Sequence, residues 1–271
     1  MQARPAAGLL PLALLAALPL PAAAQAPAPA IADNSFLLEE AYNQERGVVQ
    51  HVNTMLQPIA DPSWSYTFTQ EWPVPSQRHQ VSVTVPVLDA GGSTGFGDVA
   101  VHYRYQLLDG SRAGVAVAPR ASLLLPTGSV ARARGTGGAG AQVNLPVSKQ
   151  WGDRWVSHSN LGATWIAGAS NVFGHEADTR GFNAGQGLVW LARPAFNVLV
   201  ELAWSRAESV AAPGRVQRTD TLYLSPGVRW AHNFESGLQI VPGVAVPIGL
   251  GPSRGDDGVF LYLSFEHPFR R

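Results

Sequence analysis

The chain has 271 residues, equal numbers of acidic and basic residues and no cysteine. Its zero formal charge argues against nucleic acid as a partner, because nucleic-acid binding calls for a basic face, and the lack of cysteine excludes disulfides and thiolate metal sites. Charged residues make up 14% of the chain, below the roughly 25% of an average soluble domain.

Residues 1–24 read as a secretory signal peptide. Arg4 supplies the positive region, an apolar stretch follows, and Ala22-Ala23-Ala24 predicts cleavage after Ala24. Residues 25–34 form an Ala/Pro-rich flexible lead. We expect a short periplasmic or lumenal helix over residues 35–45, because Ser35 suits a helix cap and Leu38 lies one turn from Tyr42.

The clearest strand signal lies in residues 95–108. Apolar and tyrosine residues from Val99 to Leu107 alternate with polar ones, which is the period of a β-strand. A strand of a soluble sandwich needs about five or six residues, whereas a strand that crosses a bilayer needs roughly 9–11. This run is long enough to cross, with its apolar face toward lipid and its polar face toward a lumen.

Alternating runs of this kind continue along the chain from residue 46 to its end. They predict an all-β fold, a transmembrane antiparallel barrel of about twelve strands over residues 46–271. The predicted strands are residues 47–56, 64–72, 79–87, 95–108, 112–125, 136–148, 155–167, 181–191, 196–204, 221–230, 238–248 and 259–265. Prolines 119, 226 and 242 are expected to mark bulges, because proline removes a ladder hydrogen bond.

The connections between these runs alternate in length. Tight turns are predicted near residues 73–77, 109–111, 152–153, 193–195 and 233–237, and longer loops at 88–94, 129–135, 170–180, 205–220 and 250–257. Short turns on the periplasmic side and long loops outside are typical of outer-membrane barrels. An even strand number with both ends in the periplasm follows.

Four stretches carry a resemblance to a known family. Residues 35–45 (SFLLEEAYNQE), 47–51 (GVVQH), 65–72 (SYTFTQEW) and 95–99 (GFGDV) resemble the outer-membrane transporters linked to the meta pathway of phenol degradation. The resemblance spans roughly residues 35–269. It implies a barrel that takes up aromatic compounds, and it carries no defined site residues.

Ionisable residues on the polar faces are the lumen-lining candidates. They are Glu71, Asp98, His102, Arg104, Arg120, His158, Glu201, Arg229 and Glu266. Both signs are present, so either mutual ion pairing or selective contact with a solute explains them. Asp98 is expected to pair with Arg120 across the hairpin that follows it.

Two patterns look catalytic and are better explained otherwise. Residues 91–95 satisfy G-x-S-x-G, but a strand follows where the nucleophile elbow needs a helix. His158 and Ser159 are adjacent and so point to opposite faces of a strand, and we find no Ser/His pair on one face. The remaining histidines show no metal-ligand spacing, so no catalytic residue, metal or cofactor is predicted.

These observations predict a bacterial outer-membrane channel for passive passage of small molecules, with aromatic or apolar solutes as its cargo. Its expected partners are outer-membrane lipid, the small-molecule solute and the barrel-insertion machinery, which reads the alternating apolar residues that lead to Phe269. The alternatives are a phospholipase-like barrel enzyme and a non-conducting structural barrel. Sequence alone does not show whether the lumen is open.

Overall fold

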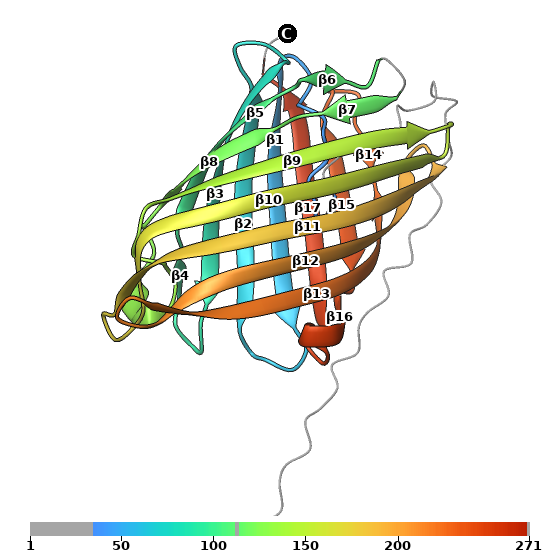
Figure 1. Ribbon diagram of the computed structural model, residues 1–271. Helices are drawn as coiled ribbons and strands as arrows, with labels where there is room; N and C mark the ends of the chain where they lie inside the picture. Colours follow the sequence, from blue (N-terminus) through green and yellow to red (C-terminus); the bar gives the residue numbers. More distant parts are fainter. Residues whose placement is uncertain (1–34, 112–113, 270–271) are drawn as a thin grey trace, which may run out of the picture.

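The computed structural model describes residues 35–111 and 114–269, which form a closed antiparallel β-barrel (Figure 1). The predicted signal peptide and residues 25–34 of the lead lie outside this range. The strand segments are β1 Val48–Pro58, β2 Trp64–Pro73, β3 His79–Asp89, β4 Thr94–Phe96, β5 Val99–Tyr105, β6 Leu108–Asp109, β7 Val115–Val117, β8 Arg120–Leu125, β9 Gly140–Trp151, β10 Trp155–Ser170, β11 Glu176–Arg193, β12 Phe196–Ala212, β13 Arg215–Trp230, β14 His232–Asn233, β15 Gln239–Ala245, β16 Ile248–Gly249 and β17 Gly258–Pro268.

These segments make up twelve barrel strands in the described part of the chain, as predicted. Four of the barrel strands are interrupted, and each consists of several segments: β4–β6, β7–β8, β13–β14 and β15–β16. The last strand, β17, pairs along its whole length with β1, and this pairing closes the ring. Closure leaves no open sheet edge, which a bilayer requires because it offers no hydrogen-bonding partners.

Prolines lie opposite the interruptions. Pro86 faces the gap between β4 and β5, Pro146 the gap between β7 and β8, and Pro226 the gap between β16 and β15. Pro242 lies similarly opposite the gap between β13 and β14. Since proline has no N–H to donate, the ladder fails in the neighbouring strand rather than in its own.

Strands β10 to β13 are longer than the sequence predicts, with 16, 18, 17 and 16 residues. The long loops predicted at residues 170–180 and 205–220 are therefore wrong, and tight hairpins replace them. Directly opposite ion pairs hold the extended ends together: Arg206 with Asp220 at 2.9 Å, and Glu208 with Arg218 at 2.9 Å. These four strands form the strongly tilted wall in Figure 1, crossing the steeper β1–β3 behind them.

Side chains alternate between an apolar outer face and a polar inner face. Leu161, Leu123 and Val143 are more than half exposed outward, at 64%, 62% and 57%. Their neighbours in sequence, among them Asn160, Ser122 and Asn144, are buried inside the ring. The barrel is thus inverted relative to a soluble protein, as a lipid-facing surface requires.

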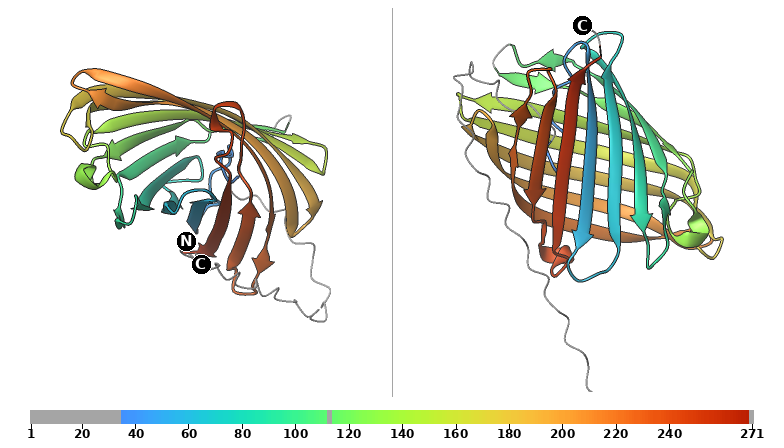
Figure 2. Two further views of the ribbon diagram at one scale, coloured as in Figure 1. Left: turned by 90° about the horizontal axis from the view of Figure 1, so that it is seen from below. Right: turned by 180° about the vertical axis from the view of Figure 1, so that it is seen from behind.

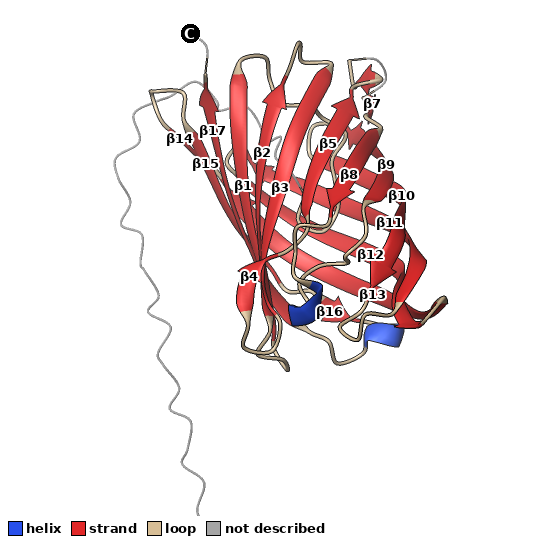
Figure 3. Cartoon of the chain, turned by 90° about the vertical axis from the view of Figure 1, so that its left-hand side faces the viewer, coloured by secondary structure: helices blue, strands red, loops and turns tan. Residues whose placement is uncertain are grey.

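Helical structure is limited to two short 3₁₀ turns in the described residues, η1 Val130–Arg132 and η2 Gly251–Ser253 (Figure 3). Neither is long and apolar enough to cross a membrane. Residues 35–45 do not form the predicted helix; they run as an irregular segment. Their backbone N–H groups bond to barrel side chains instead of to one another, which removes the intrahelical bonds that a helix needs.

Candidate functional site

The segment of residues 35–45, here called the inner segment, lies inside the barrel. In Figure 2 it appears in blue within the ring of strands. Its residues are mostly buried, with Ala41 at 0% exposure. Going along it, the contacts pass from β12 through β10 and β9 to β5 and β3, so it runs around and across the lumen rather than along a strand.

The start of the inner segment is held by Glu201 of β12. The backbone N–H groups of residues 36, 37 and 38 donate to its two carboxylate oxygens over 3.2, 3.0 and 3.2 Å. Glu201 is completely buried, and Arg229 of β13 is close enough to interact with it electrostatically. A buried carboxylate needs such partners, because an unpaired buried charge is costly.

Side-chain amides of the barrel wall hold the middle of the segment. Asn160 accepts from the Glu39 N–H at 3.0 Å and donates to the Glu39 carbonyl at 2.7 Å. Gln106 makes the same two-point contact, with the Asn43 N–H at 2.7 Å and the Ala41 carbonyl at 2.6 Å. An amide side chain offers a donor and an acceptor side by side, so it replaces a strand partner for the segment.

Arg104 of β5 binds the segment from the other side. Its guanidinium donates to the carbonyls of Glu40 and Tyr42 and to the Asn43 side chain, at 3.2, 2.7 and 3.0 Å. Five donors on a rigid plane suit this cluster of carbonyls. The segment is therefore fixed along its length by wall residues from at least five strands.

Phe36 anchors the start of the inner segment. Its ring packs against Phe260 and Tyr262 of β17, with centroids 5.6 and 5.4 Å away. Gly227 and Gly243 let the ring approach the wall, since a Cβ on either would lie 2.7 or 2.6 Å from it. These glycines form a socket for an aromatic side chain.

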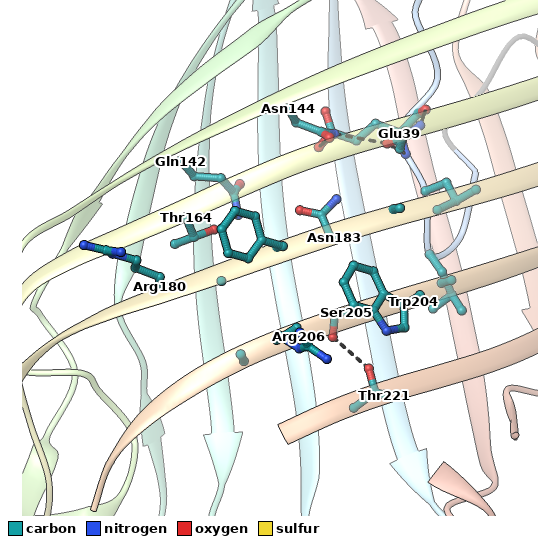
Figure 4. A pocket seen from close by; sticks show the side chains of 18 of the residues that line it. Glu39, Gln142, Asn144, Thr164, Arg180, Asn183, Trp204, Ser205, Arg206 and Thr221 are labelled. Carbon is teal, nitrogen blue, oxygen red and sulfur yellow. Dashed lines mark hydrogen bonds between the residues drawn. The ribbon is translucent and has the colours of Figure 1, made fainter. Parts of the chain in front are cut away.

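Cavities lie on both sides of the inner segment. On one side, a cavity of about 510 Å³ lies between residues 37–39 and the wall of β9–β13 (Figure 4). A second cavity of about 210 Å³ lies between residues 35–39 and β2, β3 and β5. A third, of about 260 Å³, is lined by Glu40 and Tyr42 and by residues near the tight-turn end of the barrel. The segment therefore narrows the lumen and divides it.

The ionisable residues predicted to line the lumen lie mostly around the segment. Glu71 lies 3.8 Å from Arg104. Arg120 forms a 2.7 Å ion pair with Glu39 of the segment and also donates to Gln142 at 2.7 Å. The charges are thus paired with each other, and Glu39 of the inner segment completes the second pair.

Asp98 does not pair with Arg120, so that prediction is wrong. The register sets Arg120 opposite Arg104, which is six residues along the chain from Asp98, so Arg120 is out of reach of Asp98. The Asp98 carboxylate accepts from the N–H of Gly128 at 2.8 Å, and from the N–H and hydroxyl of Thr136 at 2.7 Å. It fastens the loop between β8 and β9.

The other candidates are also accounted for. Arg229 is 2% exposed, and the Glu266 carboxylate accepts from Gln44 at 3.1 Å and from Gln50 at 2.8 Å. His158 faces inward while Ser159 faces outward and bonds to Gln186, as expected from their adjacency.

Two serine–histidine pairs do share a face, contrary to the sequence analysis. Ser148 Oγ lies 2.7 Å from His158 Nδ1, and Ser122 Oγ lies 2.7 Å from His102 Nδ1. Each pair spans two neighbouring strands, so spacing along the sequence did not show it. Ser148 is 0% exposed and its oxygen accepts the Ala41 N–H at 2.8 Å, so a substrate has no access to it.

Apart from Glu39, the residues that sequence analysis missed are uncharged. Gln80, Gln106, Asn144 and Asn160 occupy inward positions that the alternation already marked as polar, but their neutral side chains were not among the ionisable candidates. In the described part of the chain, no group of three or more His, Asp or Glu side chains is placed to hold a metal ion.

Comparison with solved structures supports the architecture. An outer membrane channel from Pseudomonas putida F1 superimposes with a TM-score of 0.66 over 84% of this chain and 97% of its own, at 12% identity. The NanC porin superimposes with a TM-score of 0.54 over 81% of this chain and 98% of its own, at 6% identity. At these identities the similarity shows the fold. No protein-family profile and no curated protein matches the sequence.

Proposed function

We propose that this protein is a bacterial outer-membrane channel through which small molecules pass without an energy source. The observation that carries the proposal is a closed barrel with an apolar exterior, whose interior is polar and holds cavities on both sides of a fixed inner segment. A barrel that served only as a scaffold has no need of polar cavities. The fold shared with an outer membrane channel and a porin supports the same proposal.

The proposal includes the finer predictions from the sequence. The chain is exported by its signal peptide, is cleaved after Ala24 and is placed in the membrane by the barrel-insertion machinery. The cargo implied by the resemblance to the phenol-degradation transporters is an aromatic or other apolar compound. The fixed inner segment sets an upper limit on cargo size, because it leaves separate cavities in place of a wide pore.

The enzyme alternative is less well supported. Catalysis on lipid needs a nucleophile that the lipid reaches, whereas both serine–histidine pairs face inward and are buried. The Ser148 hydroxyl is also occupied by the inner segment.

Conductance of the purified protein in planar bilayers tests the proposal. We expect small, discrete current steps in potassium chloride, since the inner segment narrows the lumen. Folded protein that inserts and stays electrically silent, and that also fails to admit glycine into proteoliposomes, would favour the non-conducting barrel.

A further inference from the structure

The cavity of about 510 Å³ offers many hydrogen-bonding side chains. Along β10 to β13, the side chains that line it from inward-facing positions of each strand carry no formal charge. They are Asn160, Thr164, Thr179, Asn183, Ser205, Thr221 and Tyr223. Arg180, Arg206 and Glu208 also line the cavity, although they occupy outward positions of β11 and β12.

Most ionisable residues at the cavity are already paired. Arg120 and Glu39 neutralise each other at 2.7 Å, Arg206 pairs with Asp220 at 2.9 Å, and Glu208 pairs with Arg218 at 2.9 Å. A charged solute that entered would lose hydration without gaining a counter-charge, and such losses are large in a partly desolvated space. The lining therefore disfavours ions relative to uncharged solutes.

Some polar atoms at the cavity have no hydrogen-bond partner within the described residues. Asn144 Oδ1 and Arg120 Nε are buried and make no hydrogen bond. The half-buried side chains of Asn183 and Tyr223 also line the cavity. Buried polar atoms are nearly always paired, so unpaired ones along a cavity indicate a ligand or water that pairs with them.

Two amide oxygens lie close together beside Gly162 of β10, since a Cβ placed there would overlap Asn183 Oδ1 and would lie 3.0 Å from Asn144 Oδ1. Such acceptors suit a donor such as a hydroxyl. Arg120 Nε is a donor and the Tyr223 hydroxyl is both donor and acceptor. Figure 4 shows Asn144 of β9 and Asn183 of β11, two strands with β10 between them.

We infer that this cavity is a binding site for small, uncharged solutes that carry several hydroxyl groups, such as pentoses and other polyols. Hydroxyl groups satisfy donors and acceptors alike, and the cavity volume falls within the range of about 300–1,000 Å³ that small molecules occupy. The inference rests on the proposed channel function and names its substrate class. It differs from the aromatic cargo that the family resemblance implies.

Proteoliposome swelling tests the inference, with xylose and sodium gluconate as probes. We expect the swelling rate in xylose to saturate with concentration and to exceed the rate in gluconate. Asn183→Leu, of similar size, should raise the half-saturating xylose concentration about fivefold, the effect of losing about one neutral hydrogen bond. Gln186→Leu makes the same change on the lipid-facing side of β11 and should leave that concentration unaltered.

Tyr223→Phe, which removes only a hydroxyl, gives a second variant should Asn183→Leu fail to fold. Faster entry of gluconate than xylose, xylose entry that never saturates, or equal values in wild type and folded variants would overturn the site. Failure of the channel proposal looks different: neither ions nor glycine would cross in any form of the protein.

Discussion

Replacing Glu201 with leucine should release the start of the inner segment. The change removes the acceptor for three backbone N–H groups. Each buried N–H left without a partner costs about 1–3 kcal/mol, so keeping the segment in place costs roughly 3–9 kcal/mol. Withdrawing Phe36 from its pocket costs only about 1.5–3 kcal/mol of apolar burial. Detachment of residues 35–38 is therefore the cheaper response.

Two measurements follow from that detachment. Single-channel conductance of Glu201→Leu should rise above wild type, since the lumen loses part of its constriction. A cysteine introduced at Leu37 should become reactive toward a water-soluble thiol reagent only in the Glu201→Leu background, and the chain has no other cysteine. Glu208→Leu, the same change near the outer end of β12, should do neither. Unchanged conductance together with a protected Leu37→Cys would refute the assigned role of Glu201.

Three further predictions concern the faces, the loops and the orientation. Leu202→Arg should impair folding into bilayers by about 2–4 kcal/mol, because Leu202 faces lipid. Ala203→Arg, at a position that points into the 510 Å³ cavity, should fold. Equal loss of folding in both variants would show that the two faces are misassigned. Asp98→Ala should free the β8–β9 loop and speed tryptic cleavage after Arg132, while Asp89→Ala, which loses only contacts to Gly92 and Thr94, should not. On intact cells, Phe173→Cys should be labelled and Asp153→Cys protected, and the reverse pattern would invert the proposed orientation.

The barrel was largely predictable because strand alternation is a local signal. Features of the strands that depend only on neighbouring residues, such as the outward orientation of Leu161 and Leu123, follow from the alternation of apolar and polar residues. The lengths of β12 and β13 did not, because residues 205–220 read as a polar loop. Their polarity belongs to cross-strand pairs such as Arg206–Asp220, and such pairs appear only once the register is known.

The inner segment was not predictable from its own residues. Ser35, Leu38 and Tyr42 favour a helix locally. The partners that override this preference lie far along the chain: Glu201 is 164 residues from Leu37, and Asn160 is 121 residues from Glu39. The sequence of residues 35–45 does not indicate that amide side chains of the barrel wall surround it, so tertiary contacts decide its conformation.

In the proposed channel, solutes pass an inner segment that stays in place. Cysteines introduced by Ala41→Cys and Ser148→Cys, where the Ala41 N–H lies 2.8 Å from Ser148 Oγ, allow the segment to be tethered to β9 by a disulfide. Single-channel conductance measured before and after reduction tests the claim directly. We expect the same open-channel conductance in both states. A channel that is silent while tethered and conducts only after reduction would contradict the account, because the segment would then have to leave the lumen for solutes to pass.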